Sequence, residues 1–170
     1  SHAGLPVKHF IAACNANDTV PEYFKTGKYT AKKAVATISN AMDVGDPSNF
    51  ARIYDLYQGN HREICNDISG CTFTDEMIRE SMKECYHDNG YILDPHGACG
   101  YRALKEGLKP GEKGVFCETA HPAKFKDTVE PIVGADVRIP ERLAAFMQGK
   151  KECVSMSKNF DEFKAFLMNE

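Results

Sequence analysis

Several features of membrane, nucleic-acid-binding and metal proteins are missing from this 170-residue sequence. No apolar run approaches the roughly 18 to 20 residues that a membrane span requires. Lys and Arg total 21 against 24 Asp and Glu, and the net charge of −3 does not fit a basic nucleic-acid footprint. No His, Asp or Glu cluster has the spacing of metal ligands. We therefore expect no membrane, no nucleic acid and no metal among its partners.

Paired cysteine motifs are also missing, although the sequence contains seven cysteines. There is no Cys-x-x-Cys pair, which excludes a zinc knuckle or a thioredoxin-type site. The odd count and irregular spacing predict free buried thiols in a reducing, cytoplasmic setting. The first residues show no basic region followed by an apolar run, so no signal peptide is expected. Because the chain begins at Ser1 instead of Met, we expect a processed chain or a piece of a longer one.

The residues that are present predict a soluble globular α/β domain, with 42% hydrophobic and 26% charged residues. Short apolar runs predict strands, and longer stretches with helical spacing alternate with them. Such alternation favours a small, mostly parallel sheet flanked by helices, and so few strands suggest part of a larger chain. The expected strands are 7–14, 34–38, 114–119 and 152–157; the expected helices are 20–25, 47–57, 61–68, 74–87, 94–108, 122–133, 140–147 and 161–167.

Two polar segments follow predicted strands, where open α/β sheets bind ligands. Asn15–Thr19 reads either as a helix cap or as a ligand site. Thr119–Lys124 reads either as a turn with a surface lysine or as a second wall of such a site. His96 follows Asp94-Pro95 and could cap a helix or polarise a substrate. Gly-x-Ser-x-Gly and Walker-type loops are absent.

Four motifs in order resemble those of the bacterial and fungal threonine synthases. Asn15–Pro21 (Asn-Ala-Asn-Asp-Thr-Val-Pro) comes first, and Thr37–Val44 (Thr-Ile-Ser-Asn-Ala-Met-Asp-Val) follows, with Pro47-Ser48-Asn49-Phe50 behind it. Asp94–Gly97 (Asp-Pro-His-Gly) and Thr119–Phe125 (Thr-Ala-His-Pro-Ala-Lys-Phe) complete the set. Each motif is only moderately specific, but four in the family's order are highly specific. The resemblance covers essentially the whole chain.

This resemblance implies a lyase of amino-acid biosynthesis that converts O-phosphohomoserine and water to threonine and phosphate with pyridoxal phosphate. The implied fold is that of fold-type II pyridoxal-phosphate enzymes, shared with the tryptophan synthase β subunit, and the chain would form part of its large domain. Thr119 matches the neutral hydroxyl residue that meets the pyridine nitrogen of the cofactor. Further residues expected to line the active site are Asn15, Asn17, Asp18, Thr19, Asn40, Asp43, Ser48, Asn49, His96, His121 and Lys124.

Two parts of the family pattern have no counterpart in this sequence. Phe125-Lys126-Asp127 resembles the family's Schiff-base motif, but it belongs to the His-Pro-Ala-Lys-Phe motif that begins at His121, so the aldimine role is not transferred to Lys126. The glycine-rich loop for the cofactor phosphate is also absent. We therefore expect no catalytic residue within residues 1–170, the lysine and the loop in an N-terminal half of the same polypeptide, and no activity for this chain alone. Apolar surface left uncovered would favour self-association.

Two other functions stay open at this point. The chain could be a non-catalytic binding module derived from the synthase. It could also belong to another fold-type II pyridoxal-phosphate enzyme, such as one forming diaminopropionate or cysteine. The segments Asn40–Val44 and Thr119–Phe125 favour threonine synthase over both.

Overall fold

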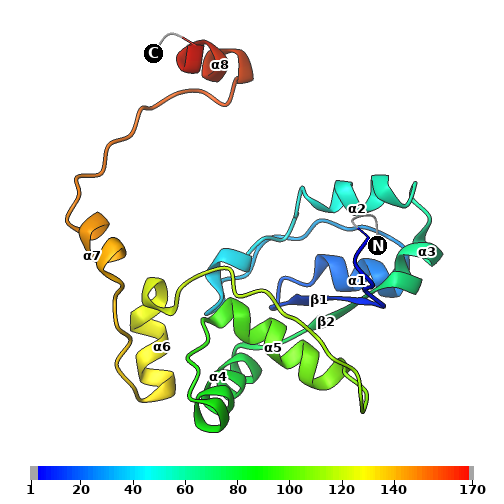
Figure 1. The fold of residues 1–170 in the computed structure, drawn as a ribbon. Coiled ribbons are helices and arrows are strands. Elements are labelled where there is room, and N and C mark those ends of the chain that lie inside the picture. Colours follow the sequence, from blue (N-terminus) through cyan, green and yellow to red (C-terminus); the bar gives the residue numbers. More distant parts are fainter. Residues whose placement is uncertain (1–3, 169–170) are drawn as a thin grey trace. The chain divides into compact units, whose positions relative to one another are not determined.

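The computed structural model describes residues 4–168, so the start at Ser1 lies outside the described residues. The chain divides into two compact units, one ending at Arg138 and one beginning at Ile139 (Figure 1). The elements in chain order are β1 (Phe10–Cys14), α1 (Thr19–Thr26), the 3-10 turn η1 (Asn40–Met42), α2 (Phe50–Leu56), α3 (His61–Asp67), β2 (Ile68–Thr72), α4 (Asp75–Asn89), α5 (Pro95–Gly107), the 3-10 turn η2 (Pro122–Phe125), α6 (Lys126–Val133), α7 (Glu141–Met147) and α8 (Phe160–Met168). The predicted α/β class with a small parallel sheet is confirmed.

The sheet consists of two parallel strands within the described residues, β1 and β2. Phe10 lies opposite Ile68 and Cys14 opposite Thr72, and the helices α1 to α3 form the crossover that parallel pairing requires. Sequence inspection missed β2, because Ser69 and Gly70 interrupt its apolar pattern. Packing explains why position 70 is a glycine, since a Cβ there would lie 2.9 Å from the Pro21 backbone in α1.

Three segments expected as strands, 34–38, 114–119 and 152–157, have no strand partner in the part of the chain that the structure describes. An extended segment becomes a strand only when a neighbour supplies hydrogen bonds along its length. Residues 114–118 instead run along α5, where Glu118 faces Gly97 and Phe116 faces Gly100. These residues are therefore extended chain that packs against a helix.

The helices begin and end close to their predicted bounds, because local signals determine those positions. The Thr74 hydroxyl accepts a hydrogen bond from the Met77 amide at the start of α4. Gly90 ends that helix with a φ of 65°, a left-handed conformation that glycine adopts without steric cost. Asp94 and Pro95 begin α5 in the same local way.

The main core lies between α4, α5 and α6. It contains fully buried Phe73, Ile78, Met82, Leu93 and Val129. A second, smaller cluster joins α1, α2 and α3 through Tyr23, Phe50 and Ile64. Among residues 4–168, no helix combines the length and apolarity needed to cross a membrane.

The unit that begins at Ile139 contains the helices α7 and α8. None of its described residues is buried, and apolar side chains such as Phe146 and Phe160 are exposed. Both helices lie where helical spacing predicts them. The buried residues of the described chain therefore all belong to the first unit.

Candidate functional site

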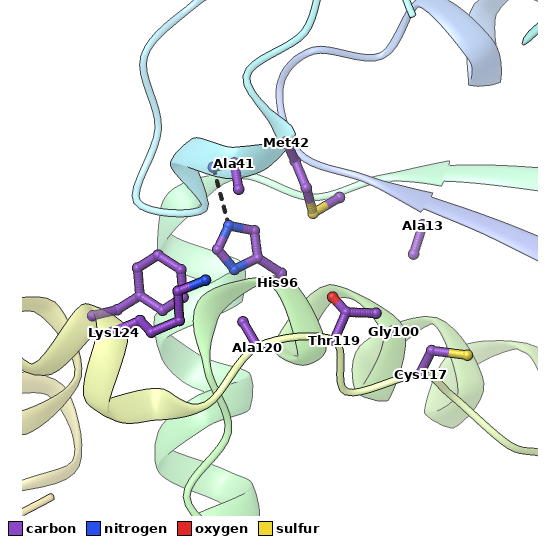
Figure 2. A pocket seen from close by; sticks show the side chains of 10 residues that line it. Ala13, Ala41, Met42, His96, Gly100, Cys117, Thr119, Ala120 and Lys124 are labelled. Atoms are coloured by element: carbon purple, nitrogen blue, oxygen red, sulfur yellow. Dashed lines mark hydrogen bonds between the residues drawn. The ribbon is translucent and has the colours of Figure 1, made fainter. Parts of the chain in front are cut away.

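A cavity of about 400 Å³ opens in the first unit, near the carboxyl end of β1. It lies between η1, the first turns of α5 and the extended segment that leads into η2 (Figure 2). Position and volume are those expected of a ligand site in an α/β protein. Its lining residues are Ala13, Ala41, Met42, His96, Gly100, Cys117, Thr119, Ala120, Lys124 and Phe125.

His96 reaches this cavity because of how α5 begins. The Asp94 carboxylate accepts a hydrogen bond from the His96 backbone amide at 2.8 Å, and Pro95 occupies the first helical position. Asp94 is therefore the cap of α5. The His96 imidazole is free to face η1 and the Phe125 ring, whose centroid lies 4.7 Å away.

The imidazole has a defined hydrogen-bonding pattern. The Ala41 backbone amide donates to Nε2 of His96 at 3.1 Å, the contact drawn in Figure 2. Nε2 therefore holds no proton, so Nδ1 must hold it and donate to the Asp94 carboxylate. The side chain of His96 is 8% exposed and that of Asp94 is 0% exposed. The imidazole is thus neutral and held between η1 and a buried carboxylate.

A second carboxyl group, that of Glu118, lies behind Asp94. The Asp94 backbone amide donates to Oε1 of Glu118 at 3.0 Å. Burial, together with the neighbouring Asp94 carboxyl, raises the pKa of Glu118 to about 7. Burial alone would also raise the pKa of Asp94, but hydrogen bonds from His96 and Glu118 hold it below its ordinary value. Glu118 therefore binds a proton more tightly than Asp94 does.

Thr119 and Lys124 present two polar groups at the cavity wall (Figure 2). Neither the Thr119 hydroxyl nor the Lys124 ammonium takes part in any hydrogen bond or ion pair with another residue of the described chain. His121, by contrast, is used locally, because its Nδ1 accepts from the Ala123 amide at 3.1 Å and caps η2. The segment 119–124 is thus both a capped turn and part of a cavity wall.

The predicted polar residues after β1 form a buried network instead of lining the cavity. Asn15 donates to Thr37 Oγ1 at 2.8 Å and to Asp43 Oδ1 at 2.9 Å. Asn17 donates to the Val35 carbonyl at 2.9 Å and accepts from the Val35 amide at 2.8 Å. These bonds tie the loop that contains η1 to the end of β1, and so they position Ala41 and Met42 at the cavity.

The other predicted residues have separate surroundings. Asp18 stands before α1 without a side-chain cap bond and accepts from the Lys32 ammonium at 2.6 Å. Thr19 is buried and donates to the Gly45 carbonyl at 2.8 Å. Three more, Asn40, Ser48 and Asn49, are exposed and do not line the cavity. Of all the predicted site residues, the structure brings His96, Thr119 and Lys124 together at the cavity.

No sequence pattern indicates Glu118 or the apolar walls formed by Met42 and Phe125 as part of the site. The apolar run 114–119 predicts a strand and gives Glu118 no role. The signal was its charge, because a carboxylate at the end of an apolar run needs a partner once that run is buried. Its partner Asp94 is 24 positions away, which no local pattern reveals.

Comparison with known proteins gives a consistent result. The family model described as "Threonine synthase, C-terminal" matches residues 97–167. Threonine synthase of Haemophilus influenzae is 41% identical over 165 residues, which is 97% of this chain and 38% of that protein. The chain therefore spans about two fifths of the length of the curated relatives it matches.

Solved structures agree with the sequence matches. The crystal structure of threonine synthase from Escherichia coli superposes with a TM-score of 0.80 at 40% identity, covering 98% of this chain and 38% of that one. A structure described as pyridoxal-phosphate-bound threonine synthase from Brucella melitensis has a TM-score of 0.78 at 24% identity, covering 98% of this chain and 41% of that one, and it supports the fold alone. By sequence and by fold, this chain is similar to the C-terminal part of the threonine synthases.

Proposed function

We propose that the cavity is part of the active site of a threonine synthase, which converts O-phosphohomoserine and water to threonine and phosphate with pyridoxal phosphate. The observation that supports this is the pair of uncommitted groups at the cavity, the Thr119 hydroxyl and the Lys124 ammonium. The relatives' names agree with it. On this proposal the chain corresponds to the C-terminal portion of the large catalytic domain.

The chemistry of the wall fits one side of this cofactor. Thr119 offers a neutral hydroxyl, and a pyridine nitrogen that meets a neutral partner stays largely unprotonated. Met42 and Phe125 offer apolar surface to a flat ring. When bound, pyridoxal phosphate supplies an electron sink for carbanion chemistry, while the protein supplies orientation. Thr119 would therefore hold the ring edge.

Lys124 is the cation of the same wall. Its ammonium belongs to the turn η2, whose position is held by the His121 cap. A positive charge without an ion-pair partner attracts a phosphate group. We therefore assign it to the phosphate of the substrate or of the cofactor.

Lys126 is not proposed as the Schiff-base lysine. Its ammonium pairs with Asp136 and with Glu130, each at 3.0 Å, and donates to the Val137 carbonyl at 3.0 Å. These contacts tie Lys126 to α6 and the segment after it, and it is not among the residues lining the cavity. The reactive lysine and the glycine-rich loop are therefore proposed to come from the portion of the relatives that this chain does not match.

A chimera tests the proposed function. The part of Escherichia coli threonine synthase that this chain matches is replaced by the chain itself, and threonine formation from O-phosphohomoserine is measured. We expect activity in the chimera. Thr119→Val, which keeps the shape but removes the hydroxyl, should lower kcat about three- to tenfold, the usual value of one hydrogen bond. Thr119→Ser, which keeps the hydroxyl, is the matched control and should retain activity.

The isolated chain in the same assay should release no threonine, because we assign Lys124 to a phosphate group and expect the cofactor-linking lysine in the portion that this chain does not match. A Thr119→Val chimera as active as the parent would contradict the role of Thr119. Threonine released by the isolated chain would contradict the need for the remaining portion. A chimera that binds pyridoxal phosphate without forming threonine would favour a different reaction of the same fold.

A further inference from the structure

Two buried carboxyl oxygens behind the cavity have no hydrogen-bond donor among the described residues. They are Oδ2 of Asp94 and Oε2 of Glu118. A buried acceptor without a donor costs free energy, more so when the group is charged. The two carboxyl groups are neighbours, because the Asp94 backbone amide donates to Oε1 of Glu118 at 3.0 Å, and their interaction lowers the pKa of Asp94 and raises that of Glu118. A single proton held between them would satisfy both oxygens.

The imidazole cannot supply that proton. Its Nε2 accepts from the Ala41 amide, and its Nδ1 proton is already directed at Oδ1 of Asp94. The proton that satisfies the second Asp94 oxygen must therefore come from Glu118. Protonated Glu118 can do this while its Oε1 continues to accept from the Asp94 amide.

Within residues 4–168, no Lys or Arg forms an ion pair with either carboxyl group, and the ion-pair partner of Asp94 is His96. Other titratable groups that interact with Asp94 or Glu118 are Cys99 on α5, Cys85 on α4, and Tyr91 in the loop between these helices. None of these is a Lys or an Arg, so two adjacent negative charges would stand without compensation. Two neighbouring buried carboxyl groups favour retention of one proton.

We propose that Glu118 holds a proton and donates it to the Asp94 carboxylate, and that Glu118 is thereby a positioning residue that holds His96 as the neutral Nδ1–H tautomer at the cavity wall. Glu118 acts through Asp94 and does not line the cavity itself. The proposal concerns this chain alone; its meaning for catalysis rests on the proposed function.

Gly97 provides the space that this arrangement needs. A Cβ at position 97 would overlap the Glu118 carboxyl group. The glycine in the first turn of α5 therefore lets the extended segment bring Glu118 against Asp94. The same turn holds Asp94, His96 and Gly97 together.

Nuclear magnetic resonance of the full 170-residue chain tests the proposal without cofactor or substrate. Long-range proton–nitrogen spectra report the His96 tautomer, and carbon spectra follow the Glu118 carboxyl from pH 4 to 9. We expect the Nδ1–H tautomer and a Glu118 midpoint of about 7. The His96 resonances should shift with that same midpoint, because the pair contacts the imidazole.

Glu118→Gln is the decisive variant. Its amide can donate to Asp94 and accept from the Asp94 amide, so it imitates protonated Glu118 at every pH. We expect it to keep the His96 tautomer and to abolish the shift of the His96 resonances near pH 7. Glu106→Gln, which changes an exposed glutamate on α5 that pairs with Arg102, is the matched control and should leave that shift unchanged.

Three results would overturn the proposal: His96 protonated at Nε2, Glu118 titrating together with Glu106, or a shift of the His96 resonances near pH 7 that persists in Glu118→Gln. The last would place the titrating proton on the imidazole instead of the carboxyl pair. Both the wild-type titration and the shape-conserving variant use folded chain, so loss of folding does not obscure the result. Failure of the chimera to make threonine would leave these spectra unaffected, so the two proposals fail separately.

Discussion

Glu118 shows how burial changes the chemistry of a single carboxyl group. It closes an apolar run, yet its side chain meets Asp94 and its oxygen accepts from the Asp94 backbone. Burial raises the pKa of Glu118 to about 7, so near neutral pH this residue is a hydrogen-bond donor as well as an acceptor. Glutamate is usually a surface anion, but protonated Glu118 is neutral and can donate a hydrogen bond to Asp94 behind the cavity.

This raised pKa predicts a pH dependence of stability. Because Glu118 binds its proton more tightly in the folded chain, its contribution is fully present below the ordinary pKa of 4.5 and is lost as pH rises through about 7. Asp94, whose pKa is lowered, acts in the opposite direction at more acidic pH. The free energy of unfolding of Glu118→Gln should therefore rise relative to wild type between pH 4.5 and 8, by up to about 3 kcal/mol.

Urea unfolding at several pH values measures this difference. Glu106→Gln should follow wild type in parallel, because that side chain is 53% exposed. A constant difference between wild type and Glu118→Gln across this range would contradict a raised Glu118 pKa. The comparison uses differences between variants, so common effects of pH on the chain cancel.

At the scale of elements, the glycines of α5 determine how closely the segment 114–118 approaches the helix. Gly97 faces the Glu118 carboxyl, and a Cβ at Gly100 would lie 3.1 Å from the Phe116 Cβ. Glycine destabilises a helix by about 1 kcal/mol relative to alanine, so these two residues lower the stability of α5 while they permit close packing. The extended segment is consequently held by helix contacts and not by strand pairing.

Gly97→Ala should destabilise the chain by about 1 to 2 kcal/mol, because displacement of the Glu118 carboxyl outweighs the gain in helix propensity. Gly100→Ala should change stability less, since a Cβ there would lie 3.1 Å from the Phe116 Cβ, a tight contact that a shift of a few tenths of an ångström relieves. Chemical unfolding of each variant gives these values.

A double-mutant cycle isolates the cause. When Glu118→Ala has removed the carboxyl group, Gly97→Ala should become neutral or stabilising by up to about 1 kcal/mol. If Gly97→Ala costs the same in both backgrounds, the overlap with Glu118 is not its cause.

At the scale of the whole molecule, the buried residues are unevenly distributed along the chain. Those that the structure describes all precede Ile139, whereas α7 and α8 have none. Helices of 7 and 9 residues are marginal in water without packing. Stability should therefore come from the first unit. The self-association expected from apolar surface stays a prediction.

Limited proteolysis and truncation test this distribution. A protease should cut first within residues 139–168, where local unfolding costs little. A chain ending at Arg138 should unfold with a free energy within about 0.5 kcal/mol of the full chain. A loss above about 2 kcal/mol on truncation, or first cleavage within α4 or α5, would contradict this expectation.

Local chemistry explains what could be predicted from the sequence by itself. The bounds of α4 and α5 follow from Thr74, Gly90 and the Asp94-Pro95 pair, because caps and left-handed glycines act on adjacent backbone groups. The ordered motifs predict the family, and the alternation of short apolar runs with helical spacing predicts the α/β class. Thr119–Lys124 was recognised as a candidate site for the same reason, since all its residues lie in one short segment.

Only the tertiary structure decided which polar side chains face one another and which face the cavity. Asn15 and Asn17 resemble ligand-binding residues in the sequence, yet their side-chain amides donate to residues of the loop 35–43. The sequence by itself determined where α5 begins, and the fold decided that Glu118, 24 residues after Asp94, would meet it there. Caps depend on neighbours in the chain, whereas strand pairing and buried carboxyl pairs depend on residues that only folding brings together.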